Sequence, residues 1–172
     1  HAGRGNQTGR YNTSVGQESL DGTGNNSSNT AVGFRAGKGI TTGSDNVFIG
    51  KNAGYTIDDG SSNVVIGDDA DVSATNSSNQ IVIGKGATGT TNNTVLLGNG
   101  SITNWLPTDD NEVDLGSSTK EMKDIYVDGV AYTDALGFGT VAMTLPTADG
   151  SADQVLKTDG SGNLGWASSG SG

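Results

Sequence analysis

Three pairs of adjacent carboxylates are the residues of this chain best suited to acid–base chemistry. They are Asp58-Asp59, Asp68-Asp69 and Asp109-Asp110. Two carboxylates flanking a glycosidic bond can hydrolyse it, one as an acid and the other as a base or nucleophile. However, neighbouring residues of a strand point to opposite faces, and the aromatic residues that usually line a sugar groove make up only 5% of the chain. We therefore expect no enzymatic activity, with a polysaccharide-degrading spike as the minor alternative.

The other chemistry available to the chain is limited. His1 is the only histidine and there is no cysteine, so no Ser-His-Asp or Cys-His machinery can be assembled within one chain. Asp110, Glu112 and Asp114 alternate along a possible strand, and three copies meeting at an axis would offer calcium a ring of oxygen ligands. A solvated acidic edge explains the same pattern, and we predict no metal and no cofactor.

Composition favours a thin, elongated β structure over a thick globular core. The 172 residues include 29 glycines, and only 31% of the chain is hydrophobic. The formal net charge is −10, so we expect no nucleic-acid binding, which requires clustered Lys and Arg. No apolar run is long enough to span a bilayer, and we predict no membrane insertion.

Regular glycine spacing is the strongest structural signal. Five glycines recur every 17 residues, and a sixth follows after 14. A fixed period of this kind predicts a solenoid. Ala2-Gly3 matches Ala36-Gly37 as the tail of an earlier copy, so we expect this chain to be a piece of a longer array. The glycine column consists of Gly16, Gly33, Gly50, Gly67, Gly84 and Gly98.

A short strand precedes each glycine. The segments NTSVG, NTAVG, NVFIG, NVVIG, QIVIG and TVLLG are bounded by turn-forming residues. If successive copies stack about 4.8 Å apart, equal offsets from the glycine become vertical columns. Four places before the glycine an amide column is predicted, in which each side chain bonds its equivalents above and below; the alternative is that Asn merely suits turns. The amide column consists of Asn12, Asn29, Asn46, Asn63 and Gln80.

Other columns also have consistent chemistry. Charges alternate in sign one place after the glycine, from Lys51 through Asp68 to Lys85, and Glu18 faces Arg35 one place further on. Three places after the glycine only small residues occur. Both strand faces are apolar in the middle copies: one can fill the interior, and the other must be buried elsewhere. We therefore predict an obligate oligomer with the outward apolar residues at the subunit interface.

The segments NTAVGFRAG, NVFIGKNAG and NVVIGDDAD resemble the head repeats of YadA-type trimeric adhesins, a motif also found in bacteriophage tail fibres. The resemblance covers roughly residues 1–103. It implies a parallel β-roll in which three chains pack around a threefold axis. The 17-residue spacing departs from the 14 residues of the last copy, and we expect the extra three to enlarge an outer loop.

The second half of the chain lacks this period. Segments 109–128 and 145–167 resemble short modules of phage tail fibres and tailspikes. Around Asp128-Gly129 a hairpin is predicted from 125–127 to 130–132, because Asp-Gly is a strong two-residue turn signal. A second hairpin with a longer loop is predicted from 154–157 to 164–166.

The sequence thus predicts an all-β chain: a parallel β-roll of 17-residue repeats over 1–103 that forms a homotrimer, β-hairpin fibre modules over 104–167, and a Gly/Ser linker over 168–172. The expected function is that of a structural segment of a phage tail fibre that supports attachment to a host surface, placed on the virion or outside the cell. The alternative is the head of a bacterial trimeric adhesin.

The expected partners are two further copies of the chain, together with a host receptor or glycan. Any receptor contact is expected in loops 21–28, 38–45, 55–62 and 72–78, because loops on a rigid scaffold vary without disturbing the core. Tyr55 and Ile57 are candidates for such a contact, although each could equally cap the edge of the fold.

Overall fold

A computed structural model describes residues 1–5, 7–22, 24–107, 115–117, 119–129, 131, 135–138 and 141–170. For 135–138 and 141–142 only the backbone is described. The chain divides into two compact units, His1–Thr108 and Asp109–Gly172. Every regular element in the described part is a strand, and none of it is a helix long and apolar enough to cross a membrane.

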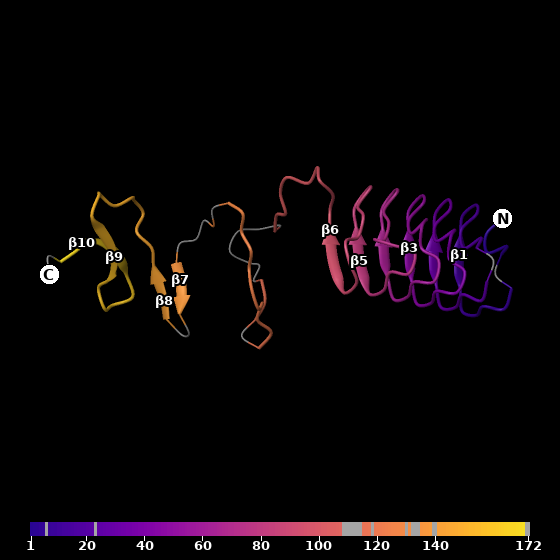
Figure 1. Ribbon diagram of the computed structural model, residues 1–172, viewed down its shortest axis with the longest axis horizontal. Helices are drawn as coiled ribbons and strands as arrows, with labels where there is room; N and C mark the ends of the chain where they lie inside the picture. Colours follow the sequence, from indigo (N-terminus) through magenta and orange to yellow (C-terminus); the bar gives the residue numbers. More distant parts are fainter. Residues whose placement is uncertain are drawn as a thin grey trace. The chain divides into compact units, whose positions relative to one another are not determined.

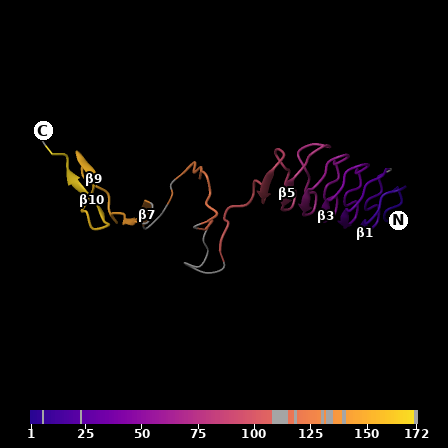
Figure 2. The same ribbon diagram turned by 90° about the horizontal axis from the view of Figure 1, so that it is seen from below.

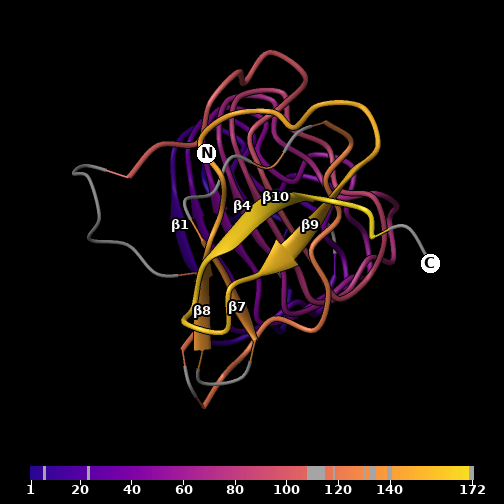
Figure 3. The same ribbon diagram turned by 90° about the vertical axis from the view of Figure 1, so that its left-hand side faces the viewer.

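The first unit is a parallel β-solenoid. Its six strands lie side by side in chain order within one sheet (Figure 1). Each circuit of the chain, here called a coil, returns the backbone to the next strand, and the coils superimpose when viewed end-on (Figure 3). The strands are β1 (Thr13–Val15), β2 (Thr30–Val32), β3 (Val47–Ile49), β4 (Val64–Ile66), β5 (Gln80–Ile83) and β6 (Thr94–Leu97).

Strand register follows the glycine spacing. Thr13 pairs with Thr30, Thr30 with Val47, and so on in steps of 17 up to Ile81, after which Gln80 pairs with Thr94. The N-terminal residues keep this offset, since the Glu18 N–H donates to the His1 carbonyl (2.9 Å) and the Gln7 N–H to the Gly24 carbonyl (3.1 Å). The first residues therefore stack on the first complete coil, as the match of Ala2-Gly3 to later copies suggested.

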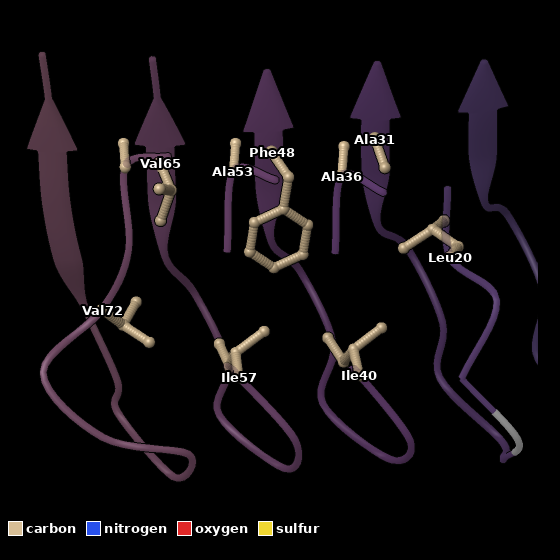
Figure 4. Packing of buried hydrophobic residues seen from close by; sticks show 10 residues of the cluster. Leu20, Ala31, Ala36, Ile40, Phe48, Ala53, Ile57, Val65 and Val72 are labelled. Atoms are coloured by element: carbon tan, nitrogen blue, oxygen red, sulfur yellow. The ribbon is translucent and has the colours of Figure 1, made fainter. Parts of the chain in front are cut away.

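The core lies inside the coils and includes one apolar residue from each of the strands β2 to β5. Ala31, Phe48, Val65 and Val82 are fully buried. A second layer of apolar residues comes from the loops, where Ile40, Ile57 and Val72 lie in one row opposite the strands (Figure 4). The small residues three places after the first five glycines are all buried, as expected for a column that faces the interior: Ser19, Ala36, Ala53, Ala70 and Ala87.

Phe48 determines which residues its neighbours can be. A Cβ added at Gly37 would lie 2.5 Å from the Phe48 ring, and one added at Gly54 would lie 2.2 Å from it. Both glycines also have positive φ angles, 58° and 62°. The residue equivalent to Gly37 on the preceding coil is Leu20. It is buried near Ala31, the small residue that stands in place of Phe48 on that coil (Figure 4). Large and small residues therefore alternate so that the interior is filled.

The second unit contains two antiparallel hairpins (Figure 2). One joins β7 (Ala135–Phe138) to β8 (Val141–Thr144), and the other joins β9 (Gln154–Thr158) to β10 (Leu164–Ser168). A hydrogen bond from the Thr144 N–H to the Gly162 carbonyl (3.0 Å) connects the two hairpins. Trp166 lies over Gly150 and donates from Nε1 to the Ala148 carbonyl (2.8 Å).

The hairpin predicted at 154–166 is confirmed, and its second strand extends to Ser168, the first residue of the predicted linker. The other predicted hairpin has a different outcome. Residues 125–127 do not form a strand, whereas Val130 and Tyr132 lie outside the described residues. Instead, the neighbouring segments β7 and β8 pair. The sequence between them, Gly139-Thr140, has glycine in the first position, which is the signal of a type II′ turn, and the prediction from Asp-Gly did not use it.

Candidate functional site

The glycine column stacks backbone directly on backbone. Its members have φ angles between 93° and 142°, a conformation that side chains rarely tolerate. A Cβ at Gly33 would lie 2.3 Å from the Gly50 carbonyl oxygen, and one at Gly50 would lie 2.4 Å from that of Gly67. The coils can approach this closely only where no side chain intervenes.

The amide column is a continuous hydrogen-bonded ladder through the interior. Asn46 Nδ2 donates to Asn29 Oδ1 (3.0 Å), and Asn63 Nδ2 donates to Asn46 Oδ1 (2.9 Å). Each Oδ1 also accepts the backbone N–H of the next member, from Asn29 onto Asn12 through to Gln80 onto Asn63. Asn29, Asn46, Asn63 and Gln80 are fully buried, so these bonds replace the water that the amides lose.

The same amides close each coil. Each asparagine donates from Nδ2 to the carbonyl 14 residues further along: Asn12 to Asn26, Asn29 to Gly43, Asn46 to Gly60 and Asn63 to Ser77. The coil that starts at Gln80 has only 14 residues and thus lacks this carbonyl. There the longer Gln80 side chain instead bonds Ser73 of the preceding loop, accepting its N–H at Oε1 (3.2 Å) and donating to its hydroxyl (2.7 Å). The change from Asn to Gln thus coincides with the shorter loop.

The charged columns form ion pairs between successive coils. Glu18 Oε2 lies 2.9 Å from Arg35 Nε and 2.6 Å from Lys38 Nζ. Lys51 Nζ lies 2.9 Å from Asp68 Oδ1, and Lys85 Nζ lies 4.0 Å from Asp68 Oδ2. These contacts confirm the pairing expected from the alternating signs. Because the side chains are partly exposed, the pairs specify register more than they add stability.

Hydrogen bonds from Lys38 and Arg35 lower the pKa of Glu18 below its ordinary value. The pKa of Asp69 is also lowered, by the Asn52 side chain and then by Lys51. Burial has the opposite effect on Asp71, whose pKa it raises, although the N–H groups of Val72 and Thr56 partly offset this. Asp71 forms no ion pair with any basic group of the described chain.

The lowered pKa of Glu18 predicts acid sensitivity of the solenoid. The folded state favours the carboxylate, so its contribution is present above the ordinary pKa and is lost as pH falls through the lower folded-state value. We expect wild type to lose more stability than Glu18→Gln when pH is lowered from neutral to below the ordinary pKa of 4.5. Urea unfolding across this range measures the effect. The control, Glu121→Gln in the second unit, should follow wild type, and parallel curves for Glu18→Gln and wild type would contradict the assignment.

The carboxylate pairs that sequence reasoning considered for hydrolysis are engaged elsewhere. Asp58 accepts a hydrogen bond from the Thr41 hydroxyl, and Asp68 and Asp69 pair with Lys51. Asp109-Asp110 and the Asp110, Glu112, Asp114 set lie outside the described residues. Among the residues that are described, no three His, Cys, Asp or Glu side chains gather closely enough to hold a metal ion.

The two apolar residues of loop 55–62 have different positions. Ile57 is fully buried in the core and is not accessible to a ligand, whereas Tyr55 is 44% exposed. Tyr55 lines a hollow of about 230 Å³ together with Arg35, Asn52, Asp69 and Asp71. This is the one part of the predicted contact loops where an aromatic ring adjoins several polar side chains.

The outer face of the solenoid sheet is apolar and uncovered in the single chain. Because successive strand residues point to opposite sides, the residues flanking each buried central residue face outward. Val15, Val95 and Leu97 are 56%, 63% and 44% exposed. The outer apolar column, one residue before each glycine, consists of Val15, Val32, Ile49, Ile66, Ile83 and Leu97.

Sequence reasoning missed a set of left-handed corners made by residues other than glycine. The position two places after each of the first five glycines, here the corner column, has φ between 54° and 62°. Four of its members carry side chains and the last is a glycine: Glu18, Arg35, Asn52, Asp69 and Gly86. A second set lies directly before each member of the amide column and before Thr94, the first residue of β6: Tyr11, Ser28, Asp45, Ser62, Asn79 and Asn93. Their enrichment in Asn, Asp and Gly, the residues that best tolerate this conformation, was an available signal.

Comparison with protein-family models, with curated proteins and with solved structures returns no significant match.

Proposed function

We propose that this chain is a structural segment of a homotrimeric fibre, most similar to a phage tail fibre, that supports attachment to a host surface. The observation that carries the proposal is the outer apolar column, which runs across all six parallel strands and whose members, apart from the half-buried Ile66, are 37% to 56% exposed in the single chain. Continuous apolar surface of this kind marks an interface, because water leaves it when it is buried.

A parallel stack offers this surface to identical copies. If the symmetry axis runs along the stack, each strand of one copy lies level with the equivalent strands of its neighbours, and the outer columns meet. The number three comes from the resemblance of the 17-residue repeats to trimeric adhesin heads. Exposed apolar side chains on the β9–β10 hairpin, Val155, Leu156 and Trp166, support assembly of the second unit as well, because isolated hairpins are only marginally stable.

The proposed role is mechanical and adhesive, without catalysis, on a virion or at a cell exterior. A rigid stack with a repeated interface separates its two ends, while the loops face outward where they can contact a surface. A net charge of −10 suits a soluble extracellular assembly.

Light scattering of the intact chain tests the assembly. We expect a mass three times the 17.3 kDa of one chain. Ile49→Asp is expected to reduce the mass to that of a single chain, because it places a charge in the middle of the outer apolar column. Thr42→Asp, on an exposed loop, serves as the control and should remain trimeric. A folded wild-type monomer would refute the proposal.

A further inference from the structure

The side chains of the corner column pair two by two and leave a gap between the pairs. Arg35 donates from Nε to Glu18 on the preceding coil (2.9 Å), and Asn52 donates from Nδ2 to Asp69 on the following coil (2.7 Å). No hydrogen bond joins Arg35 to Asn52 among the described contacts. The hollow of about 230 Å³ is lined by these two residues together with Tyr55, Asp69 and Asp71.

Both donors and acceptors line this hollow. Within the described chain only Nε of Arg35 is engaged, so the two terminal nitrogens of its guanidinium remain as donors. Asp69 and Asp71 supply carboxylate oxygens, whereas Asn52 Oδ1 is buried and does not face the hollow. Tyr55 adds a half-exposed ring with a hydroxyl.

The polar groups are already held in place. The Asp71 carboxylate accepts the N–H groups of Val72 (2.9 Å) and Thr56 (3.1 Å). The Arg35 guanidinium lies 4.7 Å from the centre of the Phe34 ring and is bonded to Glu18. Side chains that are fixed before a ligand arrives lose little conformational freedom on binding.

The composition of the walls selects the class of ligand. An anion would be repelled by the carboxylates of Asp69 and Asp71. A cation would be repelled by Arg35 and would leave the guanidinium donors without an acceptor. A hydroxyl group both donates and accepts, so neighbouring hydroxyls can serve the guanidinium and the carboxylates together. The volume is below the range of pockets for drug-sized molecules, which limits the ligand to about one ring.

We propose that this hollow binds a single neutral pyranose ring, with the sugar stacked on Tyr55 and its hydroxyls bonded to Arg35, Asp69 and Asp71. The inference rests on the proposed attachment function for its setting, and it names the receptor class as a neutral glycan. In a trimer three such sites would act together and raise the avidity for a surface that carries many copies of the sugar.

Saturation-transfer NMR with a panel of sugars tests this proposal. The probes are methyl α-glucoside, methyl α-mannoside and methyl β-galactoside, with glucosamine and glucuronate as charged comparisons, each at millimolar concentration. We expect at least one neutral glycoside to bind wild type and to bind Tyr55→Ala about tenfold more weakly, because the aromatic contact is lost. Tyr55→Phe retains the ring and should bind nearly as well as wild type. The control is Tyr11→Ala, which removes a tyrosine that is 84% exposed and does not line the hollow. This variant should bind the sugar as well as wild type.

Three results would overturn the proposal: no neutral glycoside binds, only a charged sugar binds, or Tyr55→Ala binds as well as wild type. Backbone amide shifts of wild type provide a readout that requires no variant. They should change at Arg35, Asn52, Tyr55 and Asp71 when the sugar is added, and changes confined to other coils would also overturn the site. Sugar binding is measured per chain and is independent of the light-scattering result. A monomer that binds sugar would refute the trimeric fibre but not the sugar site. A trimer that binds no neutral sugar would refute the sugar site but not the fibre.

Discussion

Gly50→Ala is expected to destabilise the solenoid by more than about 3 kcal/mol, enough to unfold it or to prevent its assembly. Two effects act together at this position. The φ angle of 132° is strained for any residue with a side chain, and the new Cβ would lie 2.4 Å from the Gly67 carbonyl oxygen. Neither coil can move away without breaking the ladder bonds on both sides. Urea unfolding followed by circular dichroism measures the loss.

Gly86→Ala is the matched control for this prediction. Gly86 also has a positive φ, 62°, but an added Cβ would have no atom within 4 Å. This variant therefore carries conformational strain without the clash, and we expect it to lose only about 1–2 kcal/mol. The φ of Gly86 is the milder one, since Glu18, Arg35, Asn52 and Asp69 adopt it at the equivalent position of their coils. Equal losses for the two variants would therefore contradict the expectation that the φ of 132° and the contact between coils together make glycine necessary at Gly50.

Asn46→Leu is expected to cost at least about 3 kcal/mol, although leucine is similar in size and more apolar. The Asn46 amide serves four partners: the Asn29 side chain, the Gly60 carbonyl, and the backbone N–H and side chain of Asn63. All of these groups are away from water. Leucine would leave the Asn63 N–H and the Gly60 carbonyl buried without a partner, and each unsatisfied group costs about 1–3 kcal/mol.

Asn12→Leu provides the comparison at the start of the ladder. Asn12 is only half-buried, and within the described chain its side chain bonds only the Asn26 carbonyl and the Asn29 N–H. Water can reach part of this site and satisfy the groups that are released, so we expect a clearly smaller loss than for Asn46→Leu. Thermal unfolding of the two variants decides the question. If Asn46→Leu is as stable as wild type, the amide ladder does not hold the interior together.

Much of the first unit follows from the spacing of residues alone. A period of 17 means that residues at equal offsets from the glycine lie above one another in a parallel stack, so the chemistry of each column can be read directly. This is why the amide ladder of Asn29, Asn46 and Asn63 and the pairing of Lys51 with Asp68 were predictable. The second unit has no period, and there only the hairpin with a long polar loop was located correctly.

The sequence by itself therefore determined the order, direction and register of the strands, because these depend on repetition, which is visible in one dimension. The tertiary structure decided which face of each strand lies inside. Both faces of β3 are apolar, and Phe48 points inward because Gly37 and Gly54 leave room for its ring when the coil closes. It also decided that Ile57 is buried whereas the neighbouring Tyr55 remains exposed beside Arg35 and Asp71. Such outcomes depend on the volume between segments that meet only when the coil is complete, and a linear pattern carries no measure of that volume.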